Sequence, residues 1–322
     1  MLAAYATRLD RDDPLAGLEV GERPDPPVPP GWVRVAVRAA SLNHHDLWSL
    51  QGVGLGADEL PRVLGCDAAG VTADGREVIV HSVIGDPAAG GGDETLDPHR
   101  SLLSERHDGT FAEHVVVPAA NLVLKPSALS FSEAACLPTA WLTAYRMLFT
   151  KAGVTPGCTV LVQGAGGGVA TAAVMLARVA GLRVWVTSRD EGKRARALEL
   201  GAHAAFEPGA RLPARVDAVL ETVGAATWSH SLKALRPGGR LVVSGATSGA
   251  NPPADLARIF YLALEVVGST MGTRAELSRL AELCSTSGLR PVIDTEMALS
   301  DARVGFARLA AGDVFGKIVF TC

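Results

Sequence analysis

Hydrophobic and polar residues alternate with a period of two over much of the first third of the chain. The alternation is clear in GWVRVAVRAA at 31–40, and VTADGREVIV at 71–80 indicates a turn followed by a strand. A strand pattern returns in TFAEHVVVP at 110–118, whereas residues 81–109 are rich in Gly, Asp and Pro and show no periodicity. We therefore expect an antiparallel β domain with one long surface loop at 81–109.

After residue 157 the pattern changes to short apolar strands that alternate with amphipathic helices. The predicted strands are TVLVQ, RVWVTS, VDAVLE, RLVVSG and EVVGS. Almost purely apolar strands of this kind indicate a parallel sheet that helices cover on both faces. The tail, which ends in GKIVF at 316–320, is expected to fold back onto the first domain. The predicted class is α/β, with a parallel sheet that helices cover on both faces inserted in a mostly β domain.

The crossover between the domains is expected shortly before this change of pattern. The segment Ser130–Glu133 reads as a capping box, which predicts the start of a helix that continues despite Pro138. We predict that residues 1–125 form the first part of the β domain, that residues 126–272 form the dinucleotide-binding domain, and that residues 273–322 return to the β domain.

The composition is that of a globular protein. Of the 322 residues 48% are hydrophobic and 20% are charged, and the formal net charge is −4. The chain has no excess of basic residues, so a nucleic-acid partner is not expected. The N-terminus lacks the long apolar segment of a signal peptide, and no apolar stretch of about 18 residues occurs, so neither a signal peptide nor a membrane span is expected. The five cysteines are scattered and show no CxxC spacing, which favours a reducing cytoplasm over a disulfide framework.

A segment nearly free of side chains joins the first strand and helix of the α/β region. The strand VLVQ at 160–163 is followed by GAGGGV at 164–169, and a helix continues from there. A diphosphate approaches only where no Cβ intrudes, and the first turn of a helix offers unpaired N–H groups to it. The order of strand, glycines and helix therefore predicts a dinucleotide-binding loop, with a plain tight turn as the alternative. The predicted contacts are Gly164, Gly166, Gly167, Gly168 and Val169.

The end of the second strand of this region bears on the choice of cofactor. An NAD-selective fold places Asp or Glu there, about 20 residues after the glycines, whereas this chain has Ser188 and Arg189. A 2′-phosphate would accept charge-assisted hydrogen bonds from Arg189 and Lys193, each worth about 1.5–3 kcal/mol. We therefore predict NADP(H). In the alternative, both cations only solvate the start of the next helix, and Asp190 binds the ribose.

Eight segments carry a family resemblance that spans nearly the whole chain. They are RAASLNHHDLW, LGCDAAGV, GTFAEHVVVP, AACLPTAWLTAY, VLVQGAGGGVA, ALELGA, LRPGGRLVVSG and FGKIVF. With them the chain resembles the medium-chain dehydrogenase/reductase superfamily and, within it, the zinc-lacking quinone-oxidoreductase-like branch. The resemblance implies a GroES-like catalytic domain, a Rossmann domain inserted in it, and a cleft that holds nicotinamide and substrate. It also implies a homodimer, or a tetramer, formed through the strand near residues 265–270.

The resemblance also marks the positions at which zinc-containing members hold their metal. Asn43 stands in place of one cysteine ligand, Cys66 in place of the histidine of a Gly-His-Glu motif, and Thr139 in place of the second cysteine. The loop in which the cysteines of a structural zinc site would fall contains none. We therefore expect no metal. The alternative is a zinc-dependent alcohol dehydrogenase with atypical ligands, drawn from the set His44, His45, Cys66 and Asp67.

Hydride transfer to a carbonyl or an enone builds negative charge on an oxygen, which hydrogen-bond donors must stabilise. The resemblance implies that Asn43 orients the substrate or supports this oxygen and that Asp46 braces the site. His44 or His45 is expected to donate the proton, with a solvated surface histidine as the alternative. The resemblance also places Thr143 beside the nicotinamide or its phosphate, with a hydroxyl bonded within its own helix as the alternative. The remaining predicted cofactor contacts are Gly245, Gly268 and Ser269.

The sequence therefore predicts an NADPH-dependent oxidoreductase that transfers a hydride, without zinc, to a small quinone, enone, enal or carbonyl compound. Reduction of an activated C=C is favoured because such a bond accepts a hydride without a Lewis acid, whereas alcohol oxidation is harder without a metal. One alternative is a non-catalytic NADPH-binding sensor or structural protein. An enoyl thioester is disfavoured because the acid-rich loop at 81–109 offers little to a phosphorylated arm.

Overall fold

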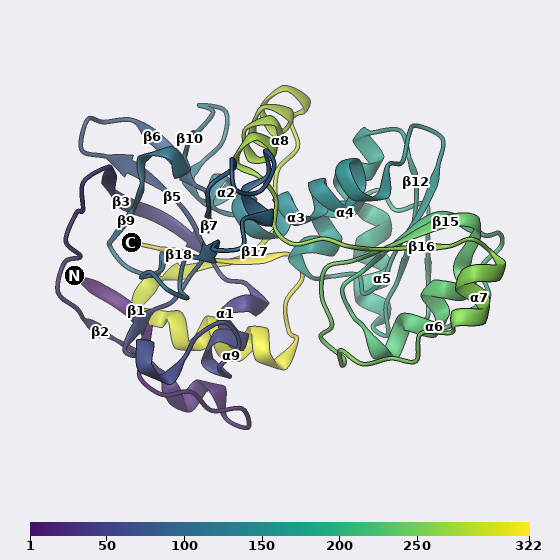
Figure 1. Cartoon of the computed structure of the whole chain (residues 1–322), viewed down its shortest axis with the longest axis horizontal. Coiled ribbons are helices and arrows are strands. Elements are labelled where there is room, and N and C mark those ends of the chain that lie inside the picture. The colour runs from purple at the N-terminus through teal and green to yellow at the C-terminus, as the bar shows by residue number, and fades with distance from the viewer. The chain divides into compact units, whose positions relative to one another are not determined.

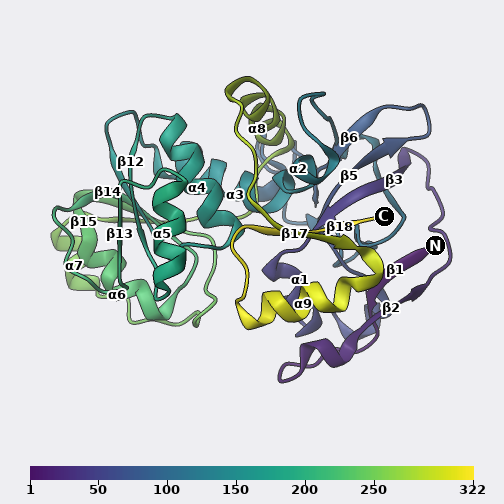
Figure 2. The same ribbon diagram turned by 180° about the vertical axis from the view of Figure 1, so that it is seen from behind.

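The computed structural model of the protein describes all residues from 1 to 322, which form two compact units. The first unit joins residues 1–142 to residues 271–322, and the second comprises residues 143–270. The N-terminal strands, drawn in purple and blue, and the C-terminal strands, drawn in yellow, therefore belong to one unit (Figures 1 and 2). The first crossover lies later than the predicted boundary at residue 125. The reason is that helix α2 (Phe131–Ala135) packs on the sheet of the first unit.

The first unit is mostly β, as predicted. Its larger sheet has the strand order β10-β6-β5-β3-β18-β17, and β9 also pairs with β3. The strands are β3 (Trp32–Ser41), β5 (Asp67–Thr72), β6 (Glu77–Val80), β9 (His114–Pro118), β10 (Leu122–Leu124), β17 (Ile293–Ala298) and β18 (Lys317–Thr321). The last strand, β18, lies antiparallel to β3 with Val319 opposite Ser41, so the tail does fold back onto the first domain.

None of the helices in the chain is both long and apolar enough to cross a membrane. Smaller elements complete the first unit. The further strands are β1 (Leu2–Ala6), β2 (Leu18–Glu22), β4 (Arg62–Val63), β7 (Val83–Ile84) and β8 (Ser101–Leu102). The α-helices are α1 (His44–Leu50), α2, α8 (Arg274–Ser287) and α9 (Ala302–Ala311). The short 3-10 helices are Pro14–Gly17, Ala57–Glu59, Glu94–Leu96, Ala119–Asn121 and Leu299–Asp301.

The predicted surface loop at 81–109 is more structured and more buried than its composition suggests. Strands β7 and β8 pair within it, and Leu103 and Ser104 have no exposed surface. The carboxylate of Glu94 accepts a hydrogen bond from the backbone N–H of Arg274, at the start of α8. This last contact spans 180 residues, so no local pattern could have predicted it.

The second unit is a six-stranded parallel sheet with the order β13-β12-β11-β14-β15-β16. Numbered along the chain this is 3-2-1-4-5-6, the order of a Rossmann fold, which reverses between β11 and β14 and confirms the predicted class. The strands are β11 (Thr159–Val162), β12 (Arg183–Thr187), β13 (Ala204–Phe206), β14 (Val216–Glu221), β15 (Leu235–Val243) and β16 (Glu265–Gly268). The helices are α4 (Gly168–Val179), α5 (Glu191–Glu199), α6 (Ala225–Ala234) and α7 (Leu256–Tyr261). Helix α3 (Leu142–Tyr145) at the crossover has π-helical turns on either side, at Leu137–Trp141 and Arg146–Ala152.

Three phenylalanine rings join the tail to the core of the first unit. Phe111 lies nearly perpendicular to Phe320, with 5.1 Å between the ring centroids, and 5.9 Å from Phe306 on α9. Gly305 makes this packing possible, because a Cβ there would lie only 2.7 Å from the Phe320 ring. The C-terminal helix and strand are thus held by a ring from the middle of the N-terminal domain.

Replacing Phe320, which lies beside both other rings, tests this packing directly. We expect Phe320→Ala to lower the free energy of unfolding by about 3–5 kcal/mol, because it opens a cavity among fully buried rings. Urea denaturation followed by circular dichroism measures the change. The control is Leu124→Ala, in which the replaced side chain is 67% exposed and lies outside the ring cluster, with an expected change within about 0.5 kcal/mol. Equal effects of the two substitutions would contradict the assignment.

Candidate functional site

The predicted glycine loop lies between the end of β11 and the start of α4. Gly164 and Gly166 have φ angles of +79° and +113°, which only glycine adopts without strain. A Cβ on Gly164 would lie 2.7 Å from the Val223 side chain, whereas one on Gly167 would meet no atom within 4 Å. Gly167 is the N-cap of α4, and no side chain caps that helix. The first N–H groups of α4, including that of Val169, are therefore free to bind an anion beside an open space.

The other predicted cofactor contacts of the second unit follow the carboxyl ends of its parallel strands. Gly245 comes two residues after the end of β15, and Gly268 ends β16. Ser269 donates its backbone N–H to Val243, and its buried side-chain oxygen has no hydrogen-bond partner within the chain. Since a buried hydroxyl without a partner costs free energy, this oxygen fits a contact to a bound ligand. Thr143 is buried in α3, and its cofactor contact stays a prediction.

The segment after β12 shows how the residues at the predicted 2′-phosphate position are used. Asp190 is the N-cap of α5 and accepts the N–H of Lys193 at 2.7 Å. The Ser188 hydroxyl accepts the N–H of Asp190 at 3.2 Å. The carbonyl of Ser188 accepts a hydrogen bond from Arg194, while the side chain of Arg189 is exposed. The alternative in which Asp190 binds the ribose is weakened, because one of its carboxylate oxygens already caps a helix.

A buried carboxylate that the sequence analysis missed supports the glycine loop. Glu221, at the end of β14, has no exposed surface and accepts the N–H groups of Val223 and Gly224 at 2.8 and 3.0 Å. The hydroxyls of Thr227 and Ser231 donate to the same carboxylate. The available signal was a glutamate that ends the apolar run VDAVLE, directly before the turn it holds.

In the first unit, a buried aspartate collects the side chains around one end of β5. Asp67 has no exposed surface, and its carboxylate accepts hydrogen bonds from Asn43 at 2.9 Å, from Thr139 at 2.6 Å and from Ser41 at 2.7 Å. The ammonium of Lys317 lies 3.6 Å away. Burial raises the pKa of Asp67, while Lys317 and the three donors favour its ionised form. Lys317 was not among the predicted residues, although a lysine inside the apolar strand GKIVF is a visible signal.

This network decides what Asn43 can do. One amide hydrogen of Asn43 is donated to Asp67 and the other to the backbone carbonyl of Ser41, while its carbonyl oxygen accepts from Lys317. With both amide hydrogens engaged, Asn43 orients the network and has no free donor for a substrate oxygen. Of the two roles that the resemblance implied, the orienting role fits this geometry. Asn43 and Thr139, which the resemblance places at two zinc-ligand positions of the family, are thus both bonded to Asp67.

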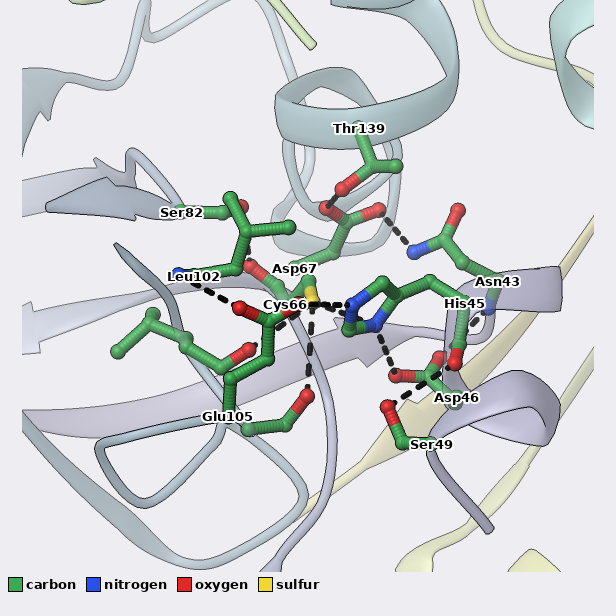
Figure 3. Close-up of polar contacts among 12 residues, drawn as sticks. Asn43, His45, Asp46, Ser49, Cys66, Asp67, Ser82, Leu102, Glu105 and Thr139 are labelled. Carbon is green, nitrogen blue, oxygen red and sulfur yellow. Dashed lines mark hydrogen bonds and ion pairs between the residues drawn. The ribbon is translucent and has the colours of Figure 1, made fainter. Parts of the chain in front are cut away.

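The two neighbouring histidines diverge at the start of α1. His44 is exposed and lies beside the ring of Trp48, with 6.3 Å between the ring centroids. His45 turns inward, where its Nδ1 lies 3.3 Å from the sulfur of Cys66 and its Nε2 lies 3.1 Å from the carboxylate of Glu105. Figure 3 shows His45 between Cys66, Asp46 and Glu105. Glu105 comes from the 81–109 region and was not predicted.

Asp46 completes this cluster from the same turn of helix. One of its oxygens accepts the backbone N–H of Asn43 at 2.8 Å, which closes the first turn of α1, while its implied bracing role stays a prediction. The other oxygen, Oδ1, is buried, has no hydrogen-bond partner and lies 3.9 Å from the Nδ1 of His45. Burial alone would lower the pKa of His45, but Cys66, Asp46 and Glu105 outweigh it and hold that pKa well above its usual value. Burial also raises the pKa of the Cys66 thiol.

Comparisons with known proteins agree with this architecture. Residues 29–127 match the family model "Alcohol dehydrogenase GroES-like domain", and residues 168–286 match "Zinc-binding dehydrogenase". The chain is 31% identical to the zinc-type alcohol dehydrogenase-like protein YogA of Leptosphaeria maculans, covering 94% of this chain and 93% of the relative. It is also 31% identical to the acryloyl-coenzyme A reductase of Metallosphaera sedula, covering 95% and 96%.

Solved structures show the same fold over the whole chain. A crystal structure of an NAD-dependent alcohol dehydrogenase superposes with a TM-score of 0.92 at 35% identity, covering 100% of both chains. The 2-octenoyl-CoA carboxylase reductase CinF, solved with NADP and 2-octenoyl-CoA, gives a TM-score of 0.91 at 25% identity, covering 100% of this chain and 87% of the other. Together with the interrupted β domain and its inserted Rossmann sheet, these relatives show that the chain belongs to the medium-chain dehydrogenase/reductase superfamily.

Proposed function

We propose that this protein, an NAD(P)-dependent oxidoreductase by its family, uses NADPH to reduce a C=C bond conjugated to a carbonyl, as in an enone, an enal or a quinone. The observation that carries the proposal is the first turn of α4, uncapped and beside open space at Gly167, on the edge of the sheet where the strand order reverses. Ligands bind at this edge in open α/β sheets. When bound, NADPH supplies a hydride to the β-carbon of such a substrate, and a proton completes the reduction.

The residues that would hold the dinucleotide follow the carboxyl ends of four parallel strands. The N–H groups at the start of α4 would bind the diphosphate. Glu221 holds the neighbouring turn in place by accepting the N–H groups of Val223 and Gly224. The exposed guanidinium of Arg189 would bind the 2′-phosphate, and the unpartnered hydroxyl of Ser269 would bind the cofactor at the end of β16. The relative CinF was solved with NADP, whereas another structural neighbour is NAD-dependent, so the 2′-phosphate is the part that needs a direct test.

The Asp67 network would shape the substrate side. Asn43 and Thr139 replace two zinc ligands of the family and are bonded to Asp67, which favours a substrate whose C=C already accepts a hydride over an alcohol that must first lose a proton. Asn43 acts as a positioning residue in this proposal. The exposed His44, and not the internally bonded His45, would deliver the proton.

A second candidate substrate is an enoyl thioester. The acryloyl-coenzyme A reductase and CinF carry such substrates in their names, and both cover nearly the whole of this chain. The reacting group is the same conjugated C=C, so the two candidates differ only in the group that follows the carbonyl.

The proposed dimer has support from the exposed surface of the second unit. Strand β16 forms one edge of the sheet, and its Val266 is 44% exposed. Large apolar side chains on the adjacent α7 are also exposed, with Phe260 at 75% and Tyr261 at 82%. An apolar sheet edge of this kind pairs readily with another chain, so we propose a homodimer through β16. All five cysteines are free, and we propose a reducing cytoplasmic location on that ground.

The cofactor preference can be measured with one substitution. Arg189→Ala should weaken NADPH binding about ten- to a hundredfold and leave NADH binding unchanged, because only NADPH carries the 2′-phosphate. Isothermal titration calorimetry gives both dissociation constants. Arg236→Ala is the matched control, since Arg236 pairs with Asp217 near the amino ends of β14 and β15, away from the predicted cofactor contacts. Equal affinity of the wild type for NADPH and NADH would contradict the NADPH preference.

The reaction can be tested by following NADPH oxidation with an enone, an enal, a quinone, acryloyl-CoA and a simple ketone. We expect turnover with one or more of the conjugated compounds and none with the ketone. Asn43→Ala should lower kcat about tenfold or more while the Kd for NADPH changes less than about twofold, because Asn43 orients the substrate side only. Unchanged kcat in this variant would remove its positioning role, and no turnover with any conjugated compound would refute the proposed function.

The oligomeric state follows from light scattering coupled to size-exclusion chromatography. The wild type should have the mass of two chains, and Val266→Lys should have the mass of one, because a charge on the sheet edge opposes pairing. The control Val304→Lys changes a valine of α9 that is 56% exposed and should remain dimeric. A monomeric wild type at micromolar concentration would rule out the proposed interface.

A further inference from the structure

We propose that His45, Asp46 and Cys66 bind a divalent metal ion of the zinc class, in a ligand set that shares only the position of Cys66 with the family's own zinc site. One ligand atom from each residue, Nδ1, a carboxylate oxygen and Sγ, lies within 4.8 Å of the other two. Imidazole, carboxylate and thiolate are the ligands that zinc accepts in proteins. The inference is independent of the proposed reduction, and it departs from our sequence-based expectation that the chain holds no metal.

The spacing of the ligand atoms is close to that of a tetrahedral site. Tetrahedral ligands of zinc lie roughly 3.3–3.6 Å from one another, given bond lengths of about 2.0–2.3 Å. The Nδ1 of His45 and the sulfur of Cys66 are 3.3 Å apart, which already fits. The Oδ1 of Asp46 lies 3.9 Å from the same nitrogen and within 4.8 Å of the sulfur, so it is the ligand that must move closer when the ion binds.

Two independent features point to a cation at this place. First, the Oδ1 of Asp46 is fully buried and has no hydrogen-bond partner, although a buried carboxylate oxygen without one is costly. Second, the opposite ring nitrogen of His45 bonds to the carboxylate of Glu105 at 3.1 Å. A histidine that binds a metal commonly donates its other N–H to a carboxylate in this way, which fixes the ring and strengthens the ligand.

The burial of the ligands indicates what such an ion would do. Cys66 is 1% exposed and Asp46 has no exposed surface, so the ion would be enclosed by the chain. The ligands come from α1 and from the start of β5, and Glu105 comes from the segment after β8. The ion would therefore tie these three segments together, and its main contribution would be to stability. The backbone carbonyl of Leu103, 3.3 Å from the sulfur of Cys66, shows how closely the chain surrounds that side of the site.

An activated thiol is the competing interpretation of the same side chains. Cys66, His45 and Glu105 lie in the order of a nucleophile, a base and a residue that orients the base. A nucleophile must reach its substrate, however, and the sulfur of Cys66 is almost completely buried. This arrangement would also leave the second oxygen of Asp46 without a partner, whereas a metal ion would satisfy it.

The test uses full-length protein treated with a chelator, dialysed and titrated with Zn²⁺ and with Co²⁺. We expect one equivalent of either ion to bind, an increase in the melting temperature with Zn²⁺, and a thiolate-to-cobalt charge-transfer band with Co²⁺. Cys66→Ser should abolish the band and stoichiometric binding, and Glu105→Gln should weaken Zn²⁺ binding about ten- to a hundredfold. The control Cys136→Ser replaces another buried cysteine of the same unit and should keep both signals.

Several results would overturn the inference. They are the absence of stoichiometric binding to the wild type, a cobalt complex without the thiolate band, or unchanged affinity in Cys66→Ser. Rapid alkylation of Cys66 by iodoacetamide in protein that binds no metal would support the activated thiol instead. If Cys66→Ser does not fold, as judged by circular dichroism, the wild-type cobalt spectrum still decides. Protein that binds the metal but oxidises no NADPH would refute the proposed function and leave this inference standing.

Discussion

A single buried carboxylate organises the first unit. Asp67 is bonded to Asn43, Thr139 and Ser41 and lies 3.6 Å from Lys317. It therefore joins the end of β3, the π-helical turn at Leu137–Trp141 and the last strand, β18, at one point. Removing one partner of a buried ion pair commonly costs about 3–5 kcal/mol, because the other charge is then left uncompensated in the interior. The tail is therefore held by charge at Lys317 as well as by the packing of aromatic rings around Phe320.

The same carboxylate also determines how Asn43 is used. A position that could bear a metal ligand is occupied by Asn43, whose amide is fully used by Asp67, Ser41 and Lys317. The network satisfies a buried negative charge with a lysine and neutral donors. The nearby His45, Cys66 and second aspartate, Asp46, do not bond to Asp67 and form a separate cluster.

In the second unit, no side chain caps the first backbone N–H groups of α4. The glycines of the 164–168 loop keep side chains away, and Glu221 fixes the adjacent turn by accepting two backbone N–H groups and two hydroxyls. Since Val223 lies where a Cβ on Gly164 would be, the turn and the loop constrain one another. Glu221 thus shapes the glycine loop through the adjacent turn.

Local pattern was sufficient for much of the fold and for the glycine loop. Period-two alternation, apolar strands and the order of strand, glycines and helix act over a few residues, so the β domain, the Rossmann sheet and the segment 164–169 could be predicted from the sequence alone.

Only the tertiary structure decided the partners of the buried charges. Lys317 reaches Asn43 across 274 positions, Thr139 reaches Asp67 across 72, and Glu105 reaches His45 across 60. Such pairs leave no periodic signal, because the residues between them can be of any kind and only the sheet order brings the ends together. For the same reason the burial of the 81–109 region could not be predicted from composition and spacing. The sequence offered His45 and Cys66 as possible metal ligands, but only the structure joined Asp46, and not Asp67, to them.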